Sequence, residues 1–290
     1  MEGSGSELEE MKSTRQAVSA AHGISLILAR DTMVTLVQIM GFMVISRLIS
    51  RVEMGVLTIA TLTVVLCQVL ASVGMPGAAT KFVSEFVALK NSKKAAGVAF
   101  IVIRTSLLIS CALGSLVFFL SRPLSLFLLG AEEFASALSL LPLAIVFGGV
   151  LPSLNGTMLG LKKIKQMTAF SLVGAIVNQA FAVLLLLCGW HLSGIVLAWG
   201  FGSLANGLLC LICIAHSLGV RQDRFDLREL FGFSLPLLAN GLLSFGYDWF
   251  DKALLLSLTS LSDLATYSVV LRAFAVLYGC LLYTSDAADE

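Results

Sequence analysis

The sequence predicts an all-α polytopic membrane protein with about eight transmembrane helices. Of the 290 residues, 58% are hydrophobic and 13% are charged, and the mean hydropathy is +0.95. Soluble domains are about 45–50% apolar and about 25% charged, so this composition disfavours a soluble enzyme. The apolar residues form long continuous runs, and a helix needs about 20 such residues to cross the hydrocarbon core. They lack the short alternating segments that are typical of barrel strands.

Eight runs are long enough to be spans. Because hydrocarbon offers no partner to backbone groups, each run is predicted to be helical. The connections between the runs are short, and no phosphate-binding Gly-x-x-x-x-Gly-Lys motif is present. We therefore expect neither an enzyme nor a cofactor or metal site. The predicted spans cover residues 31–50, 55–76, 97–120, 137–160, 167–188, 193–216, 231–256 and 264–282.

The lysines and arginines predict how the chain is oriented in the membrane. Thirteen fall in the N-terminal tail 1–30 and the even-numbered connections, and three, Arg47, Arg51 and Arg122, fall on the other side. Positive residues concentrate on the cytoplasmic side of membrane proteins. We therefore expect a multi-pass protein of the cell (plasma) membrane with a cytoplasmic N-terminus. The net charge of +1 gives no reason to expect a nucleic-acid partner.

An internal repeat organises the chain. A shift of 210 residues places Leu48-Ile-Ser50-Arg-Val-Glu53-Met54-Gly55 on Leu258-Thr-Ser260-Leu-Ser-Asp263-Leu264-Ala265. Six spans separate the two copies, so they cross the membrane in the same direction, and parallel repeats are typical of transporters. The predicted organisation is a six-helix lobe (31–216), a cytoplasmic linker (217–230) and the first hairpin of a second, parallel-repeat lobe (231–279).

The last eleven residues, 280–290, are expected to be foreign to the protein. Their sequence, Cys-Leu-Leu-Tyr-Thr-Ser-Asp-Ala-Ala-Asp-Glu, resembles the translation of a sequencing adapter. Such segments are set aside in reasoning about a fold. On this reading the native sequence is interrupted near Gly279, part-way through the protein.

Several short motifs carry a family resemblance. They are Ile45–Gly55, Val73–Glu85, Gly156–Lys163 and the series Ser234-Leu-Pro236, Asp251-Lys252-Ala-Leu-Leu and Tyr267–Arg272. Together they resemble the oligosaccharide (polysaccharide repeat-unit) flippases of the multidrug/oligosaccharidyl-lipid/polysaccharide exporter superfamily. The resemblance implies a transporter that flips a polyprenyl-(pyro)phosphate-linked oligosaccharide by alternating access between two lobes, for polysaccharide assembly. It also implies membrane lipids and glycan polymerase or ligase machinery as partners.

Arginines in or near the spans are the candidate substrate-binding residues. A charge at a helix centre costs about 2.5–3.5 kcal/mol on insertion scales, so it normally faces a cavity or a partner. Arg272 lies deep in the last span, and Arg47 and Arg51 are one turn apart. Guanidinium groups match phosphate oxygens with two parallel hydrogen bonds. The alternatives are an ion pair of Arg272 with Asp248 or Asp251, and interfacial anchoring by Arg47 and Arg51.

Asp248, Asp251 and Lys252 form the second candidate group. The two acids are spaced i, i+3 on one helix face, and Lys252 is expected to point elsewhere or toward the interface. The group is interpreted either as an ion-coupling site or as a structural pair. Amides within the spans, among them Gln38, Asn178 and Gln179, favour interhelical hydrogen bonds over sugar contacts.

Two other functions remain open from the sequence. A multidrug or organic-cation antiporter of the same superfamily would use acidic cavity residues, for which Asp248 and Asp251 are the deep candidates. An intramembrane prenyl- or glycosyltransferase would hold magnesium pyrophosphate with the same pair. Such a site usually needs two acidic clusters, and the sequence offers one.

Overall fold

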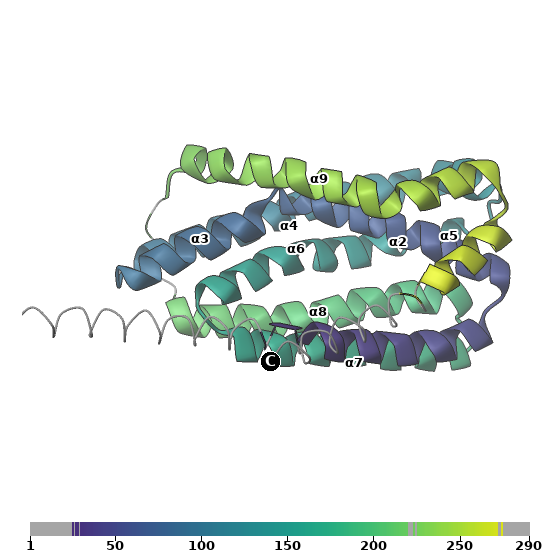
Figure 1. Ribbon diagram of the computed structural model, residues 1–290, viewed down its shortest axis with the longest axis horizontal. Coiled ribbons are helices and arrows are strands. Elements are labelled where there is room, and N and C mark those ends of the chain that lie inside the picture. Colours follow the sequence, from purple (N-terminus) through teal and green to yellow (C-terminus); the bar gives the residue numbers. More distant parts are fainter. Residues whose placement is uncertain are drawn as a thin grey trace, which may run out of the picture.

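The computed structural model describes residues 30–219 and 225–271, together with residues 25, 27, 28, 223 and 274, and every regular element in this part of the chain is a helix. Seven helical stretches are long and apolar enough to cross a membrane, and the long helices lie side by side in an elongated bundle (Figure 1). The prediction of an all-α polytopic membrane protein is confirmed. The helices are Arg30–Leu48, α2 (Arg51–Ser72), α3 (Met75–Ala88), α4 (Ser92–Leu129), α5 (Ala135–Leu138), α6 (Leu141–Gly160), α7 (Ile164–Leu187), α8 (His191–Leu218), α9 (Leu227–Leu258) and Leu261–Leu271.

The eighth predicted span is described only in part. A helix covers Leu261–Leu271, which is shorter than a full crossing. The remainder of the predicted span 264–282 lies outside the described residues, apart from Phe274. The described residues therefore contain seven full-length spans, and the eighth predicted span remains a prediction.

The connection after the second span is helical, contrary to the sequence prediction. Residues 81–88 were expected in a cytoplasmic loop but belong to α3. Helix α2 ends at Val73 and Gly74, both in the left-handed region, with φ of 47° and 66°. Pro76 then lies in the first turn of α3, where a missing backbone N–H costs nothing. Together, α2 and α3 form a single apolar stretch of 38 residues with one sharp turn.

Helix α6 occupies the centre of the bundle and packs against α2, α3, α4 and α8. Its side chains Ile145, Leu154 and Met158 are completely or almost completely buried. Small residues allow the close approach, because a Cβ on Gly156 of α6 would overlap the backbone of Pro76. Helices in membranes commonly associate through such small residues, since lipid provides no hydrophobic drive between them.

The segment before α9 is anchored by aromatic side chains. The Phe225 ring lies 5.1 Å from that of Phe82 and 5.7 Å from that of Phe86, both on α3. The Asp226 side chain caps α9 by accepting a hydrogen bond from the Arg228 backbone N–H. Helix α9 then lies along α3 and α2 (Figure 1). The predicted linker 217–230 is shorter than expected, because α8 continues to Leu218 and α9 begins at Leu227.

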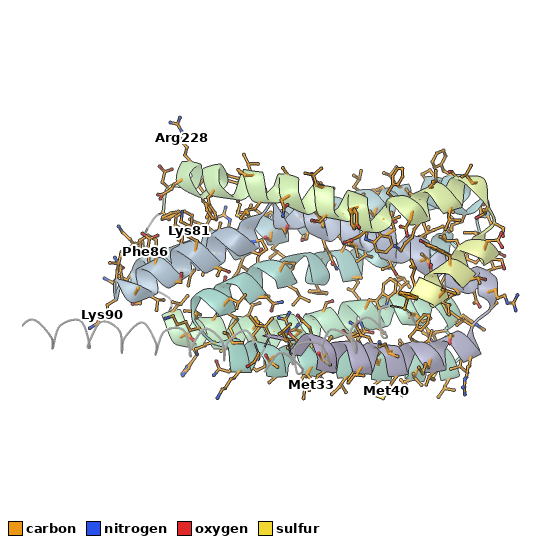
Figure 2. The ribbon with its side chains drawn as sticks, viewed as in Figure 1. Met33, Met40, Lys81, Phe86, Lys90 and Arg228 are labelled. Carbon is orange, nitrogen blue, oxygen red and sulfur yellow. The ribbon has the colours of Figure 1, made fainter. Side chains whose placement is uncertain are left out.

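The two ends of the bundle differ in charge. Figure 2 shows Lys81, Lys90 and Arg228 at one end, which is the grouping that the charge pattern predicts. Met33 and Met40 point outward from the helix Arg30–Leu48, with 52% and 61% of their surface exposed. Exposed apolar side chains along a spanning helix are suited to contact with lipid.

Candidate functional site

Two capping boxes stand at the end of the bundle opposite Lys90. At the start of α2, the Ser50 hydroxyl accepts a hydrogen bond from the Glu53 backbone N–H at 3.2 Å. The Glu53 carboxylate accepts one from the Ser50 backbone N–H at 2.8 Å. A serine at the N-cap with an acid three residues later satisfies two otherwise free N–H groups. Glu53 Oε1 also lies 3.7 Å from His191 Nδ1 at the start of α8.

The second capping box lies 210 residues later in the sequence. The Ser260 hydroxyl accepts from the Asp263 backbone N–H, and the Asp263 carboxylate accepts from the Ser260 backbone N–H, both at 3.3 Å. The preceding helices end at Leu48 and Leu258, and the following helices begin at Arg51 and Leu261. These boundaries also differ by 210. The eight-residue match in the sequence therefore corresponds to a local structure that occurs twice.

The two copies contact each other directly. Thr58 Oγ1 lies 3.1 Å from Ser268 Oγ and donates a hydrogen bond to it, and both side chains are buried. One turn earlier, a Cβ on Gly55 would overlap the backbone carbonyl of Leu261. Glycine therefore permits the helix Leu261–Leu271 to approach α2 this closely.

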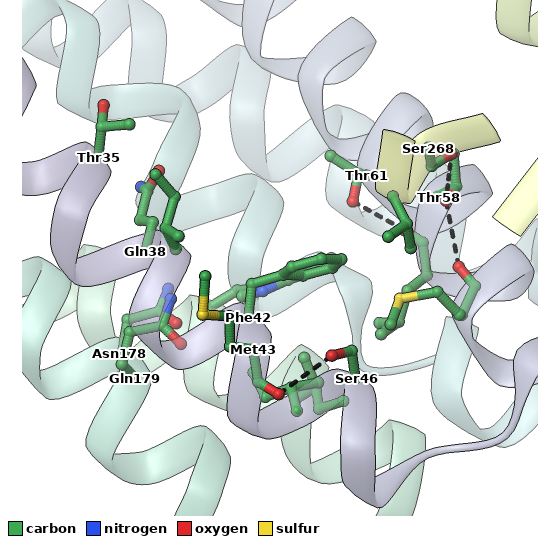
Figure 3. Close-up of a pocket in the computed structure, with 17 residues that line it drawn as sticks. Thr35, Gln38, Phe42, Met43, Ser46, Thr58, Thr61, Asn178, Gln179 and Ser268 are labelled. Atoms are coloured by element: carbon green, nitrogen blue, oxygen red, sulfur yellow. Dashed lines mark hydrogen bonds between the residues drawn. The ribbon is translucent and has the colours of Figure 1, made fainter. Parts of the chain in front are cut away.

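A cavity of about 550 Å³ lies beside this contact. It is bounded by the helix Arg30–Leu48, by α2, α7 and α8, and by the helix Leu261–Leu271. None of the described residues that line it carries a charged side chain. In Figure 3, Gln38, Asn178 and Gln179 lie on one side of Phe42, and Thr58, Thr61 and Ser268 lie on the other. The hydroxyl and amide side chains of the lining are Thr35, Gln38, Ser46, Thr58, Thr61, Asn178, Gln179 and Ser268.

Two of the three predicted substrate-binding arginines, Arg47 and Arg51, lie outside this cavity. Arg47 is next to the lining residue Ser46 in sequence, but its side chain is exposed, as is that of Arg51 at the start of α2. Successive residues of a helix point about 100° apart, which explains why Ser46 faces the cavity and Arg47 does not. Arg272 lies outside the described residues.

Of the candidate group Asp248, Asp251 and Lys252 on α9, the structure brings the side chains of Asp251 and Lys252 into contact. Asp251 accepts hydrogen bonds from the Tyr267 hydroxyl at 2.6 Å and from Lys252 Nζ at 3.2 Å. Lys252 Nζ also donates to the Asp248 backbone carbonyl at 2.6 Å. The lysine therefore folds back onto its own helix turn, where the sequence analysis expected it to point away. The Asp248 side chain is exposed.

Two features of the site were missed or undervalued in the sequence. Tyr267 was noted only as part of a motif, yet it links Asp251 of α9 to the next helix. Gln38, Asn178 and Gln179 were assigned to interhelical hydrogen bonding. Instead all three line the cavity, and Gln179 Oε1 is buried without a hydrogen-bond partner. Their meeting depends on how the helix Arg30–Leu48 packs against α7, which the amide positions alone do not reveal.

Comparison with known families gives one match. The model of a family described as "Polysaccharide biosynthesis protein" matches residues 20–288, which is most of the chain. The match extends into the segment 280–290 that the sequence analysis set aside. No curated protein and no solved structure gives a significant match.

Proposed function

The chain belongs to the polysaccharide biosynthesis protein family, and from that premise we propose that it flips a polyprenyl-(pyro)phosphate-linked oligosaccharide across the membrane by alternating access. At family level it is a membrane transporter related to polysaccharide synthesis. The lipid-linked substrate and the two-lobe movement are the specific content of the proposal.

The contact between Thr58 and Ser268 is the observation that carries the proposal. A twofold axis that relates each residue to the one 210 positions later brings the two members of a pair together only where they lie near the axis. The 3.1 Å contact is what such an axis between α2 and the helix Leu261–Leu271 would produce, and in this way it supports the proposal. Transporters with parallel repeats work by rocking one repeat against the other about an axis along the membrane normal. We infer that this contact closes one end of the path and separates in the opposite state.

Charged groups near this end supply the proposed phosphate contacts. Arg47 and Arg51 are exposed beside the helix ends, where a diphosphate can reach them without entering the cavity. Arg272, predicted to lie deeper, is proposed as a third phosphate ligand. Guanidinium stays charged in any state of the transporter and binds phosphate oxygens in pairs.

Asp251 and Lys252 are proposed as a structural pair that holds α9 to the helix Leu261–Leu271 through Tyr267. Lys252 keeps only 18% of its side chain exposed. A lysine in the membrane is tolerated when it is paired with an acid or with backbone carbonyls, and both partners are present here. An ion-coupling role for Asp251 is the alternative that the tests below distinguish.

The proposed setting is the plasma membrane, with the Lys90 end and the N-terminus in the cytoplasm. This orientation follows from the concentration of lysine and arginine at that end. Glycan polymerase or ligase machinery is the proposed downstream partner, because a flipped oligosaccharide must be joined to a growing polymer.

A reconstituted assay tests the proposed function. The chain is placed in proteoliposomes that contain a polyprenyl-diphosphate-linked oligosaccharide, and the fraction of glycan accessible to an impermeant glycosidase is followed with time. We expect that fraction to rise from half to all of the substrate. Export of an organic cation in place of this rise would support an antiporter. Magnesium-dependent release of pyrophosphate would support a transferase.

A further inference from the structure

We propose that the cavity between the helix Arg30–Leu48, α2, α7, α8 and the helix Leu261–Leu271 binds uncharged sugar rings of the substrate head. This inference rests on the proposed function and adds to it a site that recognises sugar apart from the phosphates. The inference is based on two sets of polar side chains that face each other across the cavity. Amides from two distant segments, Gln38 with Asn178 and Gln179, lie opposite hydroxyls from α2.

The chemistry of the lining matches a sugar. Amide and hydroxyl groups each donate and accept hydrogen bonds, as do the hydroxyls of a sugar ring. Among the described lining residues there is no lysine, arginine or carboxylate. A phosphate or a uronic acid in this space would be a charge removed from water without a counter-charge, which is strongly unfavourable. The described part of the lining therefore favours neutral sugars over charged ones.

The shape of the lining supports the same ligand. Trp199, on α8, and Phe42 are among the lining residues. Flat aromatic surfaces pack well against the apolar C–H faces of sugar rings, while the Trp indole N–H remains available as a donor. The volume of about 550 Å³ falls within the range of about 300–1,000 Å³ that is usual for small-molecule sites.

Gln179 is a lining residue whose amide oxygen is unsatisfied. Its Oε1 is buried and has no hydrogen-bond partner in the described structure. A buried amide oxygen without a partner costs free energy, and such groups are rare unless a ligand or water completes them. Gly41 packs directly against this amide, since a Cβ at that position would overlap it. Because Gly41 covers the oxygen, a sugar hydroxyl can donate the missing hydrogen bond only when the helix Arg30–Leu48 shifts from α7, whereas the acyl chain of a lipid cannot donate it in any position.

Tryptophan fluorescence tests the site without requiring transport. In a chain carrying Trp190→Phe and Trp249→Phe, Trp199 is the remaining tryptophan. The chain in lipid nanodiscs is titrated with methyl glucoside and N-acetylglucosamine as neutral probes, and with glucuronate and inorganic pyrophosphate as charged probes. We expect a saturable change in Trp199 emission with the neutral probes only. A matched chain with Trp199→Phe and Trp249→Phe reports from Trp190, which is 53% exposed and lies outside the cavity lining, and should not respond.

Two variants assign the response to the cavity. Asn178→Ala removes a lining amide but keeps the Cβ that packs against Gly202, and we expect sugar binding about tenfold weaker, because a hydrogen-bonding partner of the sugar is lost. Asn240→Ala, on the exposed side of α9, should leave binding unchanged.

Three results would overturn the inference. They are a response to pyrophosphate or glucuronate, no response to any sugar, and quenching of Trp199 by brominated acyl chains that sugar does not relieve. The last result would identify a lipid tail as the occupant. Sugar binding without translocation would instead contradict the proposed function and leave the site intact.

Discussion

Thr58 and Ser268 are joined by a hydrogen bond of 3.1 Å, and the same 210-residue offset relates their surroundings. The Thr58 hydroxyl lies 3.1 Å from the Met54 carbonyl, and the Ser268 hydroxyl lies 2.8 Å from the Leu264 carbonyl. Met54 and Leu264 are themselves a repeat pair, and both are buried. The two helices thus present equivalent surfaces to each other, as expected at an axis between two related lobes.

Gly55 is expected to be required for closure at this axis. Gly55→Ala places a methyl group against the backbone carbonyl of Leu261, which cannot move like the end of a flexible side chain. We expect translocation in proteoliposomes to fall several-fold. Gly246→Ala on α9 is the matched control, because nothing lies within 4 Å of its Cβ. Equal rates for the two variants would show that close approach at Gly55 is unimportant.

The two capping serines are expected to contribute alike to stability. Ser50→Ala and Ser260→Ala each remove an N-cap acceptor, which typically costs about 1 kcal/mol. The measurement is the free energy of unfolding in detergent for each variant. Ser257→Ala, which removes a hydroxyl bonded only to the Leu254 carbonyl within its own helix, should have a smaller effect. A loss at Ser50 with none at Ser260 would argue against equivalent repeats.

Tyr267 is expected to stabilise the fold through its hydrogen bond to Asp251. Tyr267→Phe deletes the hydrogen bond to Asp251 and should lower the free energy of unfolding by about 1 kcal/mol, a typical value for an interhelical hydrogen bond in a membrane. Tyr247→Phe, at a hydroxyl-bearing ring that is 88% exposed, should leave stability unchanged.

Asp251→Asn separates the structural role from an ion-coupling role. If Asp251 serves the pair with Lys252 and Tyr267, the variant loses stability, and its translocation depends on proton and sodium gradients just as the parent's does. Unchanged stability with an altered gradient dependence would instead identify Asp251 as a coupling residue. Translocation is therefore measured with each gradient imposed in turn.

Arg47 and Arg51 are expected to contribute more to substrate translocation than to the stability of the fold. Because both side chains are exposed, the double variant Arg47→Gln/Arg51→Gln should keep the parent's free energy of unfolding. Its translocation of a diphosphate-linked oligosaccharide should fall by at least about tenfold, since hydrogen bonds to charged groups contribute about 1.5–3 kcal/mol each. Arg122→Gln, at another exposed arginine predicted on the same membrane side, should leave the rate unchanged. A similar loss in both variants would point to general surface charge.

The sequence predicted the class of fold and the repeat, because both depend on local patterns. Apolar runs of span length identify membrane helices directly, and the Ser-x-x-acid spacing at Ser50 and Ser260 is a local signal for a helix start. The connection predicted between the spans 55–76 and 97–120 was wrong over residues 81–88, which are helical. There, the charge of Lys81 was assigned to a connection, while the turn at Gly74 and the restart at Pro76 permitted a second helix.

The site was harder to predict because it is assembled by tertiary packing. The cavity combines residues from segments more than 200 positions apart, such as Thr35 and Ser268. The direction of Lys252 likewise depends on the backbone carbonyl of Asp248 that it finds in the folded helix. Charge in a span identified the arginines as unusual, but only the fold shows that Arg47 and Arg51 face away from the cavity.

Reversible cross-linking at the axis is the most direct test of alternating access. In a chain with Thr58→Cys and Ser268→Cys, whose parent hydroxyls are 3.1 Å apart, mild oxidation should form a disulfide between the two helices and stop translocation of the lipid-linked oligosaccharide. A reductant should restore it. A chain with Thr58→Cys and the exposed Thr266→Cys serves as the control and should remain active under oxidation. Full translocation by the cross-linked Thr58–Ser268 chain would show that the two helices never separate, and would contradict the rocking of two lobes about this contact.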